Sequence, residues 1–449
     1  MKKSVIRSLV VLAMGVGAMS LSACEVKAKE YVAGNPIKVG LICLHDESST
    51  YDKNFIDAMG VAAKNLGTKL DGEPIIKTGI PEDQKCYNAA RDLVKQGCNV
   101  IFADSFGHEE FMLKAAKKWP QVQFCHATGT QALVADVANY HNAFASIYQG
   151  RFLAGYAAGL KLREMNQLGQ IKAENKDDNG NVKLGYIGAF QYAEVISGYT
   201  SWYLGVKTAV ERDSSIAGVV MDVTFTKSWF DPTAEEAGAK TLIGRGAALI
   251  SQHADSMGAP SACENNKDSN GAANPIPNVT YNVETKTSCP NSYLAYSRIN
   301  WAPYYEAVVG AMFGGKAIEG ESNNNWTGTI ESGSVEYNVN WDNVSSDATR
   351  LAAYKEEFHG AEETVKEDGA VAVFNTSYFT VGGKEVTTAQ ADVRDMGDYV
   401  PETEAIKSAT VSGQETKYYN ESSDRSAPYF DLSIDGINLL NSGFPDPEE

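Results

Sequence analysis

The feature that most limits the possible folds of this chain is a repeated pattern. Short apolar runs alternate with helical stretches in two successive series. In the first series each apolar run predicts a strand, and the stretches between the runs place apolar residues on one helical face. The predicted strands are 37–43, 75–80, 99–104 and 122–125, and the predicted helices are 54–66, 87–96 and 109–118. Repeated alternation of this kind is typical of a parallel sheet covered by helices. The first part of the chain is therefore predicted to form an α/β lobe.

The same alternation begins again after a predicted helix at 151–163 and a polar loop at 177–180. The second set of predicted strands is 183–188, 218–226, 247–251 and 279–283, and its helices are 196–212 and 234–244. Two similar lobes in series predict a cleft between them. Ligands of open α/β sheets bind beyond the carboxyl ends of the strands, so the loops that follow these strands are the expected ligand site.

The last third of the chain departs from this pattern. A helix is predicted at 301–313, short strands and turns at 319–340 and 371–383, and no regular structure in the polar stretch 410–426. We expect these boundaries: lobe 1 at 37–148 plus about 292–320, lobe 2 at 149–291, and a partly irregular C-terminal covering segment at 321–449.

The first residues predict that the protein is exported. A basic start is followed by the apolar run Leu9–Ala18, which is the layout of a secretory signal and is too short to span a bilayer. Leu21-Ser22-Ala23-Cys24 resembles the bacterial lipobox, in which the cysteine after the cut receives lipid. We expect a signal peptide at 1–23, lipidation at Cys24 and a lipidated tether at 24–36. The alternative is an ordinary cleaved signal in which Cys24 is incidental.

Composition excludes several classes of function. Lysine and arginine number 39 against 57 aspartates and glutamates, which gives a formal net charge of −18. This charge repels phosphate backbones and anionic bilayers, so no nucleic acid is predicted as a partner and membrane contact is expected through the lipid anchor only. With 43% hydrophobic residues the chain can bury substantial cores, which argues against wholesale disorder.

The cysteines leave several pairings open. Six remain besides Cys24, and they are Cys43, Cys86, Cys98, Cys125, Cys263 and Cys289. Export permits disulfides, but six cysteines allow fifteen pairings. The candidate disulfide is Cys263 with Cys289, because these residues bracket a segment rich in Asn, Ser, Lys and Pro. For the other four, buried free thiols are an equal alternative.

Motifs for catalysis are scarce. The sequence has no phosphate-binding loop ending in Lys-Ser/Thr, no His-Glu-x-x-His and no Gly-x-Ser-x-Gly. Asp177-Asp178-Asn179-Gly180 has some likeness to a calcium loop, but it lacks the later bidentate Glu and predicts a turn instead. No metal, no cofactor and no enzymatic activity are therefore predicted.

Aromatic side chains and carboxylates occur together directly after four of the predicted strands. An aromatic face stacks on a flat heterocycle, while a carboxylate accepts from ring N–H, amino or ribose hydroxyl donors. The set therefore fits a nucleobase. Its members include His45, Asp46, Tyr51, Phe55, Asp104, Phe106, Trp229, Phe230, His253 and Asp255. Singly, each has a structural alternative: Phe55 in a core, Trp229 in lobe packing, and Asp104 or Asp255 as helix caps.

Several motifs in a fixed order resemble the basic membrane protein family. They are the lipobox, Lys38-Val39-Gly40, Asp52-Lys53-Asn54-Phe55, Tyr148-Gln149-Gly150-Arg151-Phe152-Leu153-Ala154-Gly155, Trp229-Phe230-Asp231-Pro232, Gln252-His253-Ala254-Asp255-Ser256 and Asn300-Trp301-Ala302-Pro303-Tyr304-Tyr305. That family comprises lipoprotein substrate-binding components of ABC importers, related to purine-nucleoside receptors. The resemblance runs from about residue 38 to 387. It implies a type I periplasmic binding protein: two Rossmann-like lobes, joined by hinge crossings, with a ligand cleft between them.

The resemblance also implies ligand contacts. Phe55 or its neighbour Tyr51 would form one side of an aromatic sandwich, and Trp229 the other. Asp104 would bind the edge of the base.

Asp46 and Asp255 would bind the ribose or the remaining polar edge. The form Gln252-His253-Ala254-Asp255 looks more like the adenine-type branch than the nucleoside branch, whose loop is rich in glycine. The sequence departs from its relatives in the segment between Cys263 and Cys289 and in its longer C-terminal part.

The leading hypothesis is a monomeric lipoprotein on the extracytoplasmic face of the cell membrane, at the cell surface or in a periplasm. Its partners would be a purine base or nucleoside and the permease subunits of an ABC importer. Three alternatives stay open: a receptor of the same fold for a sugar or other small polar ligand, a nucleoside hydrolase, and a surface antigen or adhesin.

Overall fold

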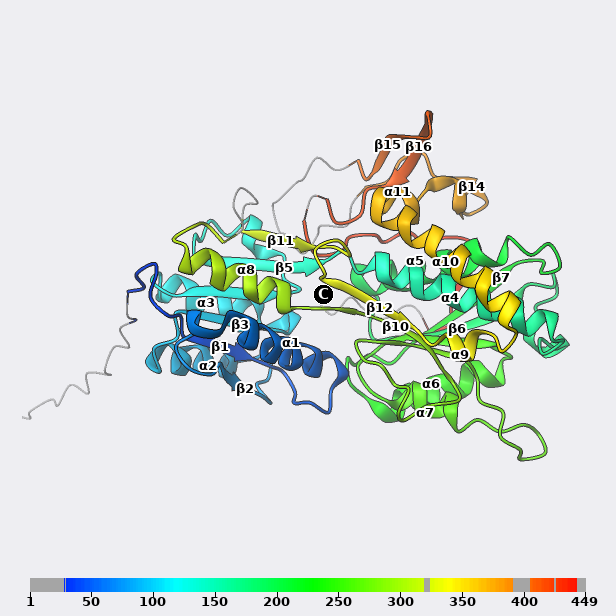
Figure 1. The fold of residues 1–449 in the computed structure, drawn as a ribbon, viewed down its shortest axis with the longest axis horizontal. Helices are drawn as coiled ribbons and strands as arrows, with labels where there is room; N and C mark the ends of the chain where they lie inside the picture. Colours follow the sequence, from blue (N-terminus) through cyan, green and yellow to red (C-terminus); the bar gives the residue numbers. More distant parts are fainter. Residues whose placement is uncertain (1–27, 29, 319–323, 391–403, 424, 442–449) are drawn as a thin grey trace, which may run out of the picture.

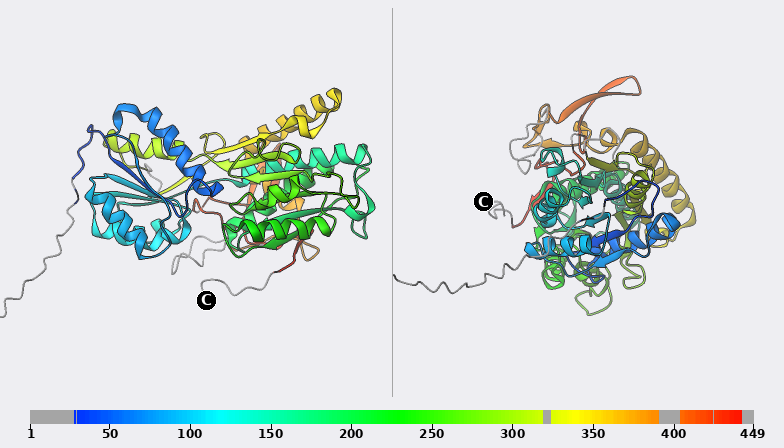
Figure 2. Two further views of the ribbon diagram at one scale, coloured as in Figure 1. Left: turned by 90° about the horizontal axis from the view of Figure 1, so that it is seen from below. Right: turned by 90° about the vertical axis from the view of Figure 1, so that its left-hand side faces the viewer.

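A computed structural model describes residues 28, 30–318, 324–390, 404–423 and 425–441. They form two α/β lobes that lie side by side (Figures 1 and 2). The sheet of lobe 1 is parallel, in the order β11-β5-β4-β3-β1-β2. Its strands are β1 (Val39–Ile42), β2 (Ile75–Lys77), β3 (Val100–Ala103), β4 (Gln123–Ala127), β5 (Tyr140–Ala145) and β11 (Asn325–Gly328). Its helices are α1 (Thr50–Leu66), α2 (Gln84–Lys95), α3 (Glu109–Lys118) and α8 (Ala302–Phe313).

The sheet of lobe 2 has the order β12-β10-β9-β8-β6-β7-β17. Only β12 is antiparallel to its neighbour among these described strands. The strands are β6 (Val182–Gly188), β7 (Val219–Phe225), β8 (Leu249–His253), β9 (Asn278–Tyr281), β10 (Tyr293–Ile299), β12 (Val335–Val339) and β17 (Ile437–Leu439). The helices are α4 (Tyr148–Gln167), α5 (Ala193–Val210), α6 (Pro232–Gly244), α7 (Gly258–Glu264) and α9 (Trp341–Val344).

Connections at 146–147, 300–301 and 329–334 carry the chain between the lobes and lie beside one another. The Ser146 N–H donates to Gly328 O at 2.8 Å, and the Asn300 N–H donates to Ser334 O at 2.8 Å. The connections are therefore hydrogen-bonded into a single hinge, on which the lobes can move relative to each other.

The structure corrects the expected extent of lobe 1. The stretch 292–320 was expected to belong to lobe 1, but β10 pairs in parallel with β9 in the sheet of lobe 2. Only α8, which packs against α1, joins lobe 1. The segment 321–449 is also more than a cover, because β11 extends one sheet while β12 and β17 extend the other. Sheet edges offer unpaired N–H and C=O groups, so distant strands can complete them.

The C-terminal part has more regular structure than the sequence predicts. The helix α10 (Ala348–Asp368) was not predicted, and the short helix α11 (Ala370–Val373) begins the stretch 371–383, where strands and turns were expected. Strands β13 (Thr380–Val381) and β14 (Lys384–Glu385) form a small hairpin there. The prediction of no regular structure at 410–426 is wrong, because β15 (Ile406–Val411) pairs with β16 (Gln414–Tyr419) across a turn at Ser412 and Gly413.

The candidate disulfide is not formed, and both of its cysteines are buried free thiols. The carboxylate of Glu264 holds this segment instead. It accepts hydrogen bonds from the backbone N–H groups of Asn291 and Ser292, and also from Asn291 Nδ2 at 2.6 Å and Ser292 Oγ at 2.8 Å. The other four cysteines are buried free thiols too.

No helix in the described part of the chain is both long enough and apolar enough to cross a membrane. The predicted signal peptide and the lipidation site Cys24 lie outside the described residues.

Candidate functional site

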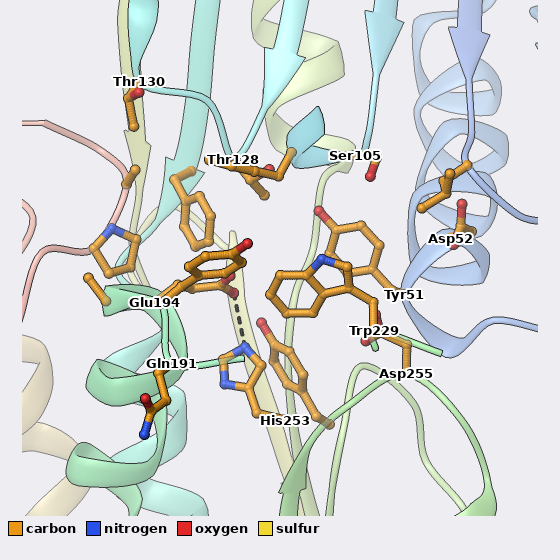
Figure 3. Close-up of a pocket in the computed structure, with 18 of the residues that line it drawn as sticks. Tyr51, Asp52, Ser105, Thr128, Thr130, Gln191, Glu194, Trp229, His253 and Asp255 are labelled. Atoms are coloured by element: carbon orange, nitrogen blue, oxygen red, sulfur yellow. Dashed lines mark hydrogen bonds and ion pairs between the residues drawn. The ribbon is translucent and has the colours of Figure 1, made fainter. Parts of the chain in front are cut away.

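A cavity of about 160 Å³ lies between the lobes, at the carboxyl ends of the strands of both sheets (Figure 3). Its walls come from the loops that follow β1, β3 and β4 in lobe 1, and β6, β7 and β8 in lobe 2. The C-terminal part of the chain adds a further wall with Arg425, Ala427 and Pro428. The cavity is therefore where the alternating pattern of the sequence predicts a ligand site.

The lobes touch each other around this cavity. The Thr50 N–H at the start of α1 donates to Asp255 O in lobe 2 at 2.9 Å. The rings of His45 and Phe230 are 5.5 Å apart, and those of Phe106 and Tyr192 are 5.9 Å apart. The structure is therefore a closed form, in which the cavity is enclosed by residues of both lobes.

Three of the six predicted ligand-binding residues line the cavity: Tyr51, Trp229 and Asp255. Tyr51 projects from α1, and its hydroxyl donates to Asp104 O at 2.7 Å. Trp229 follows β7, with its ring 5.3 Å from that of Phe190 in an edge contact and 5.9 Å from that of Tyr192. Aromatic rings from both lobes therefore reach one space (Figure 3).

The other three predicted residues do not line the cavity. Asp46 is exposed, and its carboxylate accepts from the backbone N–H and the hydroxyl of Ser48 in a local turn. Phe55 is buried in the core of lobe 1, stacked on Trp301 at 4.5 Å. Asp104 is buried and accepts from the Leu44 N–H at 3.1 Å, while the next residue, Ser105, reaches the cavity.

Asp52 takes the lining position that the sequence analysis gave to Asp46. One of its oxygens accepts from the His45 N–H at 2.7 Å, and the other lies 3.4 Å from His45 Nδ1. Burial acts to raise the pKa of Asp52, but the hydrogen bonds from His45 and Ser49 outweigh it and lower the pKa. Asp52 therefore presents an ionised carboxylate to the cavity.

Two carboxyl groups near Asp52 have pKa values shifted the other way. Burial, and next the charge of Asp52, raise the pKa of Asp104 well above its usual value. Burial also raises the pKa of Asp255, helped by the charges of Glu235 and Asp52. A neutral carboxyl group can donate a hydrogen bond as well as accept one. The cavity thus combines an acceptor carboxylate at Asp52 with a carboxyl group at Asp255 whose protonated, donor-bearing form is favoured by burial.

Two further residues line the cavity: Glu194, which was not predicted from the sequence, and His253, which was expected near the site but was given no ligand contact. Glu194 lies in the first turn of α5, and its Oε1 is 3.0 Å from His253 Nε2 at the end of β8. Burial and the nearby Arg151 lower the pKa of His253, so the ring is neutral and its Nε2–H donates to Glu194. The Arg151 guanidinium lies 3.5 Å above the Tyr281 ring, and Tyr281 also lines the cavity.

The sequence signal for His253 was its place directly after a predicted strand, in the motif Gln252–Asp255, of which only Asp255 was assigned a ligand contact. Glu194 gave none, since the helix was expected to begin two residues later, at 196.

The loop after β4 brings a strained residue to the cavity. Thr128 has φ of 69°, which is costly for a β-branched side chain. Its backbone N–H donates to Ala143 O at 3.0 Å, and its hydroxyl has no hydrogen-bond partner among the described residues. Strained backbone conformations of this kind are common at ligand sites, where the surrounding fold holds the residue in place.

A metal is not assigned to the site. The ligand atoms of Cys43, Asp52 and Asp104 lie within 4.8 Å of one another. However, burial and the charge of Asp104 raise the pKa of the Cys43 thiol well above its usual value, and a protonated thiol is a poor metal ligand. A second group, His359, Glu362 and Glu363 on α10, lies at the surface.

Comparisons with known proteins agree with this geometry. Residues 39–365 match the family Bmp, described as ABC transporter substrate-binding protein, PnrA-like. The chain is 31% identical over 226 residues to a purine-binding protein of Brucella abortus, covering 50% of this chain and 53% of that protein. It is 28% identical over 161 residues to a protein of Haloferax volcanii named as an ABC transporter glucose-binding protein, covering 36% of this chain and 34% of that one. The chain thus spans about half of the first relative and about a third of the second.

A solved structure shares the fold. An ABC transporter solute-binding protein from Aeropyrum pernix superposes with a TM-score of 0.55 at 11% identity, covering 78% of this chain and 95% of that chain. The likeness confirms the predicted fold, a type I periplasmic binding protein with two α/β lobes.

Proposed function

The chain belongs to the Bmp family of PnrA-like ABC transporter substrate-binding proteins, and from that premise we propose that it captures a purine base or purine nucleoside outside the cytoplasm for an ABC importer. Proteins of this kind bind a small molecule and work with permease subunits. The purine-binding relative from Brucella abortus supports the ligand class.

The observation that carries the proposal is the pairing of aromatic rings with carboxyl groups around one enclosed cavity. Tyr51 from lobe 1 and Trp229 from lobe 2 offer faces on which a flat heterocycle stacks. Asp52, Glu194 and Asp255 offer oxygens to the ring N–H and amino groups of a purine. A purine presents both kinds of surface, a flat π-face and an edge of donors and acceptors.

In this proposal the protein serves transport by closing its lobes around the ligand, and no bond of the ligand is made or broken. The ligand enters the open cleft, contacts both lobes and stabilises the closed form, which the permease then recognises. Because ligand contacts come from both lobes, an empty protein lacks these contacts and only the direct contacts between the lobes favour its closure. We propose that the protein catalyses no reaction, and incubation with inosine should release no free base.

We also propose that lipid on Cys24 holds the protein at the outer face of the membrane. The tether that follows is polar and spans 24–36. In a host cell, the Cys24→Ala variant should leave the membrane fraction, whereas the Cys289→Ala variant should remain there.

The test of the ligand class is a thermal-shift screen of the protein without its signal peptide, against purine bases, nucleosides and sugars. A bound ligand raises the melting temperature by mass action. We expect at least one purine to raise the melting temperature. Titration of that purine in a calorimeter should give a heat of binding that saturates. A screen in which no purine shifts the melting temperature would rule the proposal out.

A sugar is the second candidate, because the relative from Haloferax volcanii carries the name of a glucose-binding protein. Tryptophan and carboxylates also suit sugar rings. The same screen distinguishes the two classes, since a sugar receptor would respond to monosaccharides and not to bases.

A further inference from the structure

The C-terminal part of the chain contributes residues to the ligand cavity although it lies outside the stretch 39–365 that matches the family. Residues 425–428, which we call the strap, supply Arg425, Ala427 and Pro428 to the lining. The red C-terminal segment passes between the two lobes (Figure 2). The cavity therefore has one wall that a chain ending at residue 365 would lack.

The strap is attached to lobe 1 at the edge of its sheet. Ser426 Oγ donates to Asn325 Oδ1 on β11 at 2.7 Å, and the Ser426 N–H donates to the same oxygen at 3.3 Å. Ala427 is 5% exposed and packs into the core of lobe 1. These contacts hold the strap against the lobe that also carries Tyr51.

The residues that follow the strap are anchored against lobe 2, because Tyr429 and Phe430 belong to the same buried apolar cluster as the core residues of α4. The Tyr429 N–H donates to the buried carboxyl group of Glu421 at 2.9 Å, and Tyr429 O accepts from the Tyr419 hydroxyl at 2.9 Å. The Phe430 ring stacks on that of Phe374 at 4.8 Å. The strap therefore joins both lobes beside the cavity, so its position is coupled to their closure.

Arg425 gives the strap its shape. The side chain is 4% exposed; its Nε donates to Ala427 O at 3.2 Å and its Nη2 donates to Pro428 O at 3.1 Å. One planar guanidinium thus fixes the carbonyl groups of Ala427 and Pro428, the other two strap residues that line the cavity. A guanidinium holds two acceptors at once in a fixed geometry, which a lysine or a glutamine cannot reproduce.

The size of the cavity indicates what the strap does. Its volume of about 160 Å³ is below the roughly 300–1,000 Å³ of pockets that hold drug-sized ligands. A free base is a smaller ligand than its nucleoside, which carries a ribose in addition. A wall that is fixed to both lobes leaves little room for such an extension.

We propose that the strap is a specificity-determining element that selects a free purine base over the corresponding nucleoside, with Arg425 as the positioning residue that sets its shape. This inference rests on the proposed purine-binding function. It adds that residues outside the family-matched region set the size limit of the ligand.

The experiment compares dissociation constants, measured by calorimetry, for adenine with adenosine and for hypoxanthine with inosine. The wild type should prefer the base. Arg425→Gln removes the guanidinium, and we expect the preference for the base to fall by roughly tenfold, the scale of discrimination set by pocket contacts. Lys417→Ala is the matched control, because Lys417 is an exposed cation of the same C-terminal part. This variant should prefer the base over the nucleoside as strongly as the wild type does.

A second variant guards against misfolding of Arg425→Gln, which circular dichroism and the melting temperature would reveal. Ser426→Ala deletes only the hydroxyl that binds Asn325, and it should shift the preference in the same direction by a smaller factor. A wild type that prefers nucleosides, or an unchanged preference in the folded strap variants, would overturn the inference while leaving purine binding intact. A wild type that binds none of the four ligands would instead end the proposed function, and the strap inference with it.

Discussion

At the scale of single residues, Trp229 is the side chain whose loss should affect ligand binding most directly. It lines the cavity from lobe 2 and contacts Phe190 and Tyr192. Trp229→Ala should weaken purine binding by about 1–3 kcal/mol, the range for stacking of a base on an aromatic side chain. Trp341→Ala is the control: Trp341 packs on Phe358 away from the cavity, so its loss should lower stability and leave affinity unchanged. Calorimetry that gave equal affinities for both variants would remove Trp229 from the site.

The carboxylate of Glu264 stabilises the folded protein, and this stabilisation depends on pH. Its carboxylate accepts hydrogen bonds from Asn291 and Ser292 across the segment that was expected to need a disulfide. Burial alone would raise the pKa of Glu264, but the hydrogen bonds from Ser292 and Asn291 lower it below the usual value. Because the folded-state pKa is the lower one, the stabilisation is present above the unfolded-state pKa. It is lost as pH falls through the folded-state pKa.

Glu264→Ala should therefore lower the free energy of unfolding by about 1.5–3 kcal/mol near pH 7, the scale of hydrogen bonds to a charged group. At a pH low enough to protonate the carboxylate in both states, the variant should differ less from the wild type. Denaturant unfolding at the two pH values measures this. A difference in stability that does not depend on pH would contradict the role given to the charge.

At the scale of elements, the contact between α4 and α5 depends on two glycines. A Cβ on Gly155 would lie 2.1 Å from Trp202 O, and one on Gly205 would lie 2.0 Å from Phe152 O. Both neighbours are backbone atoms, which cannot rotate away. The two helices therefore approach so closely only because neither residue has a side chain.

Gly155→Ala should lower the free energy of unfolding by about 1–3 kcal/mol, because the added methyl group forces the helices apart. Gly60→Ala is the matched control within a helix: a Cβ at Gly60 in α1 meets no atom within 4 Å. It should stabilise the protein by about 0.5–1 kcal/mol through helix propensity. Opposite signs in thermal or denaturant unfolding would confirm the role of the close contact, whereas equal small effects would contradict it.

The elements of the two lobes were largely predictable, and those of the C-terminal part were not. Strands such as β1 and β3 are continuous apolar runs, because both faces of a parallel sheet are covered by helices. The hairpin of β15 and β16 lacks such a signal, since most of its side chains are intermediate or exposed. The partner strand of β17 could not be predicted either, because its three residues pair with β7, which is more than 200 positions away.

At the scale of the whole molecule, ligand affinity should depend on bonds that exist only when the lobes are closed. The Thr50 N–H donates to Asp255 O across the cleft. Thr50 is the first residue of α1 after its N-cap, Ser49, and proline is well tolerated at that position. Thr50→Pro thus removes the cross-cleft donor while keeping the helix.

We expect Thr50→Pro to weaken ligand binding by about 0.5–1.5 kcal/mol, the net value of one hydrogen bond, without lowering the melting temperature of the empty protein. Thr50→Ala retains the N–H and should bind as the wild type does. Small-angle scattering should also show a smaller radius of gyration with ligand than without. Closure would be excluded as the source of affinity if the proline and alanine variants bound equally well.

The sequence by itself determined the two α/β lobes and the edge of each sheet where the ligand site lies, because hydrophobic periodicity is a local property that directly reflects burial on a sheet or helix. It also identified Tyr51, Trp229 and Asp255 as cavity residues. Only the tertiary structure decided that Asp52 and Glu194 line the cavity while Asp46 and Phe55 do not. Neighbouring residues in a loop or first helical turn point in different directions, and that direction is set by packing. The strap at 425–428 is likewise a product of tertiary structure, because residues separated by about a hundred positions, such as Asn325 and Ser426, meet only after the chain has folded.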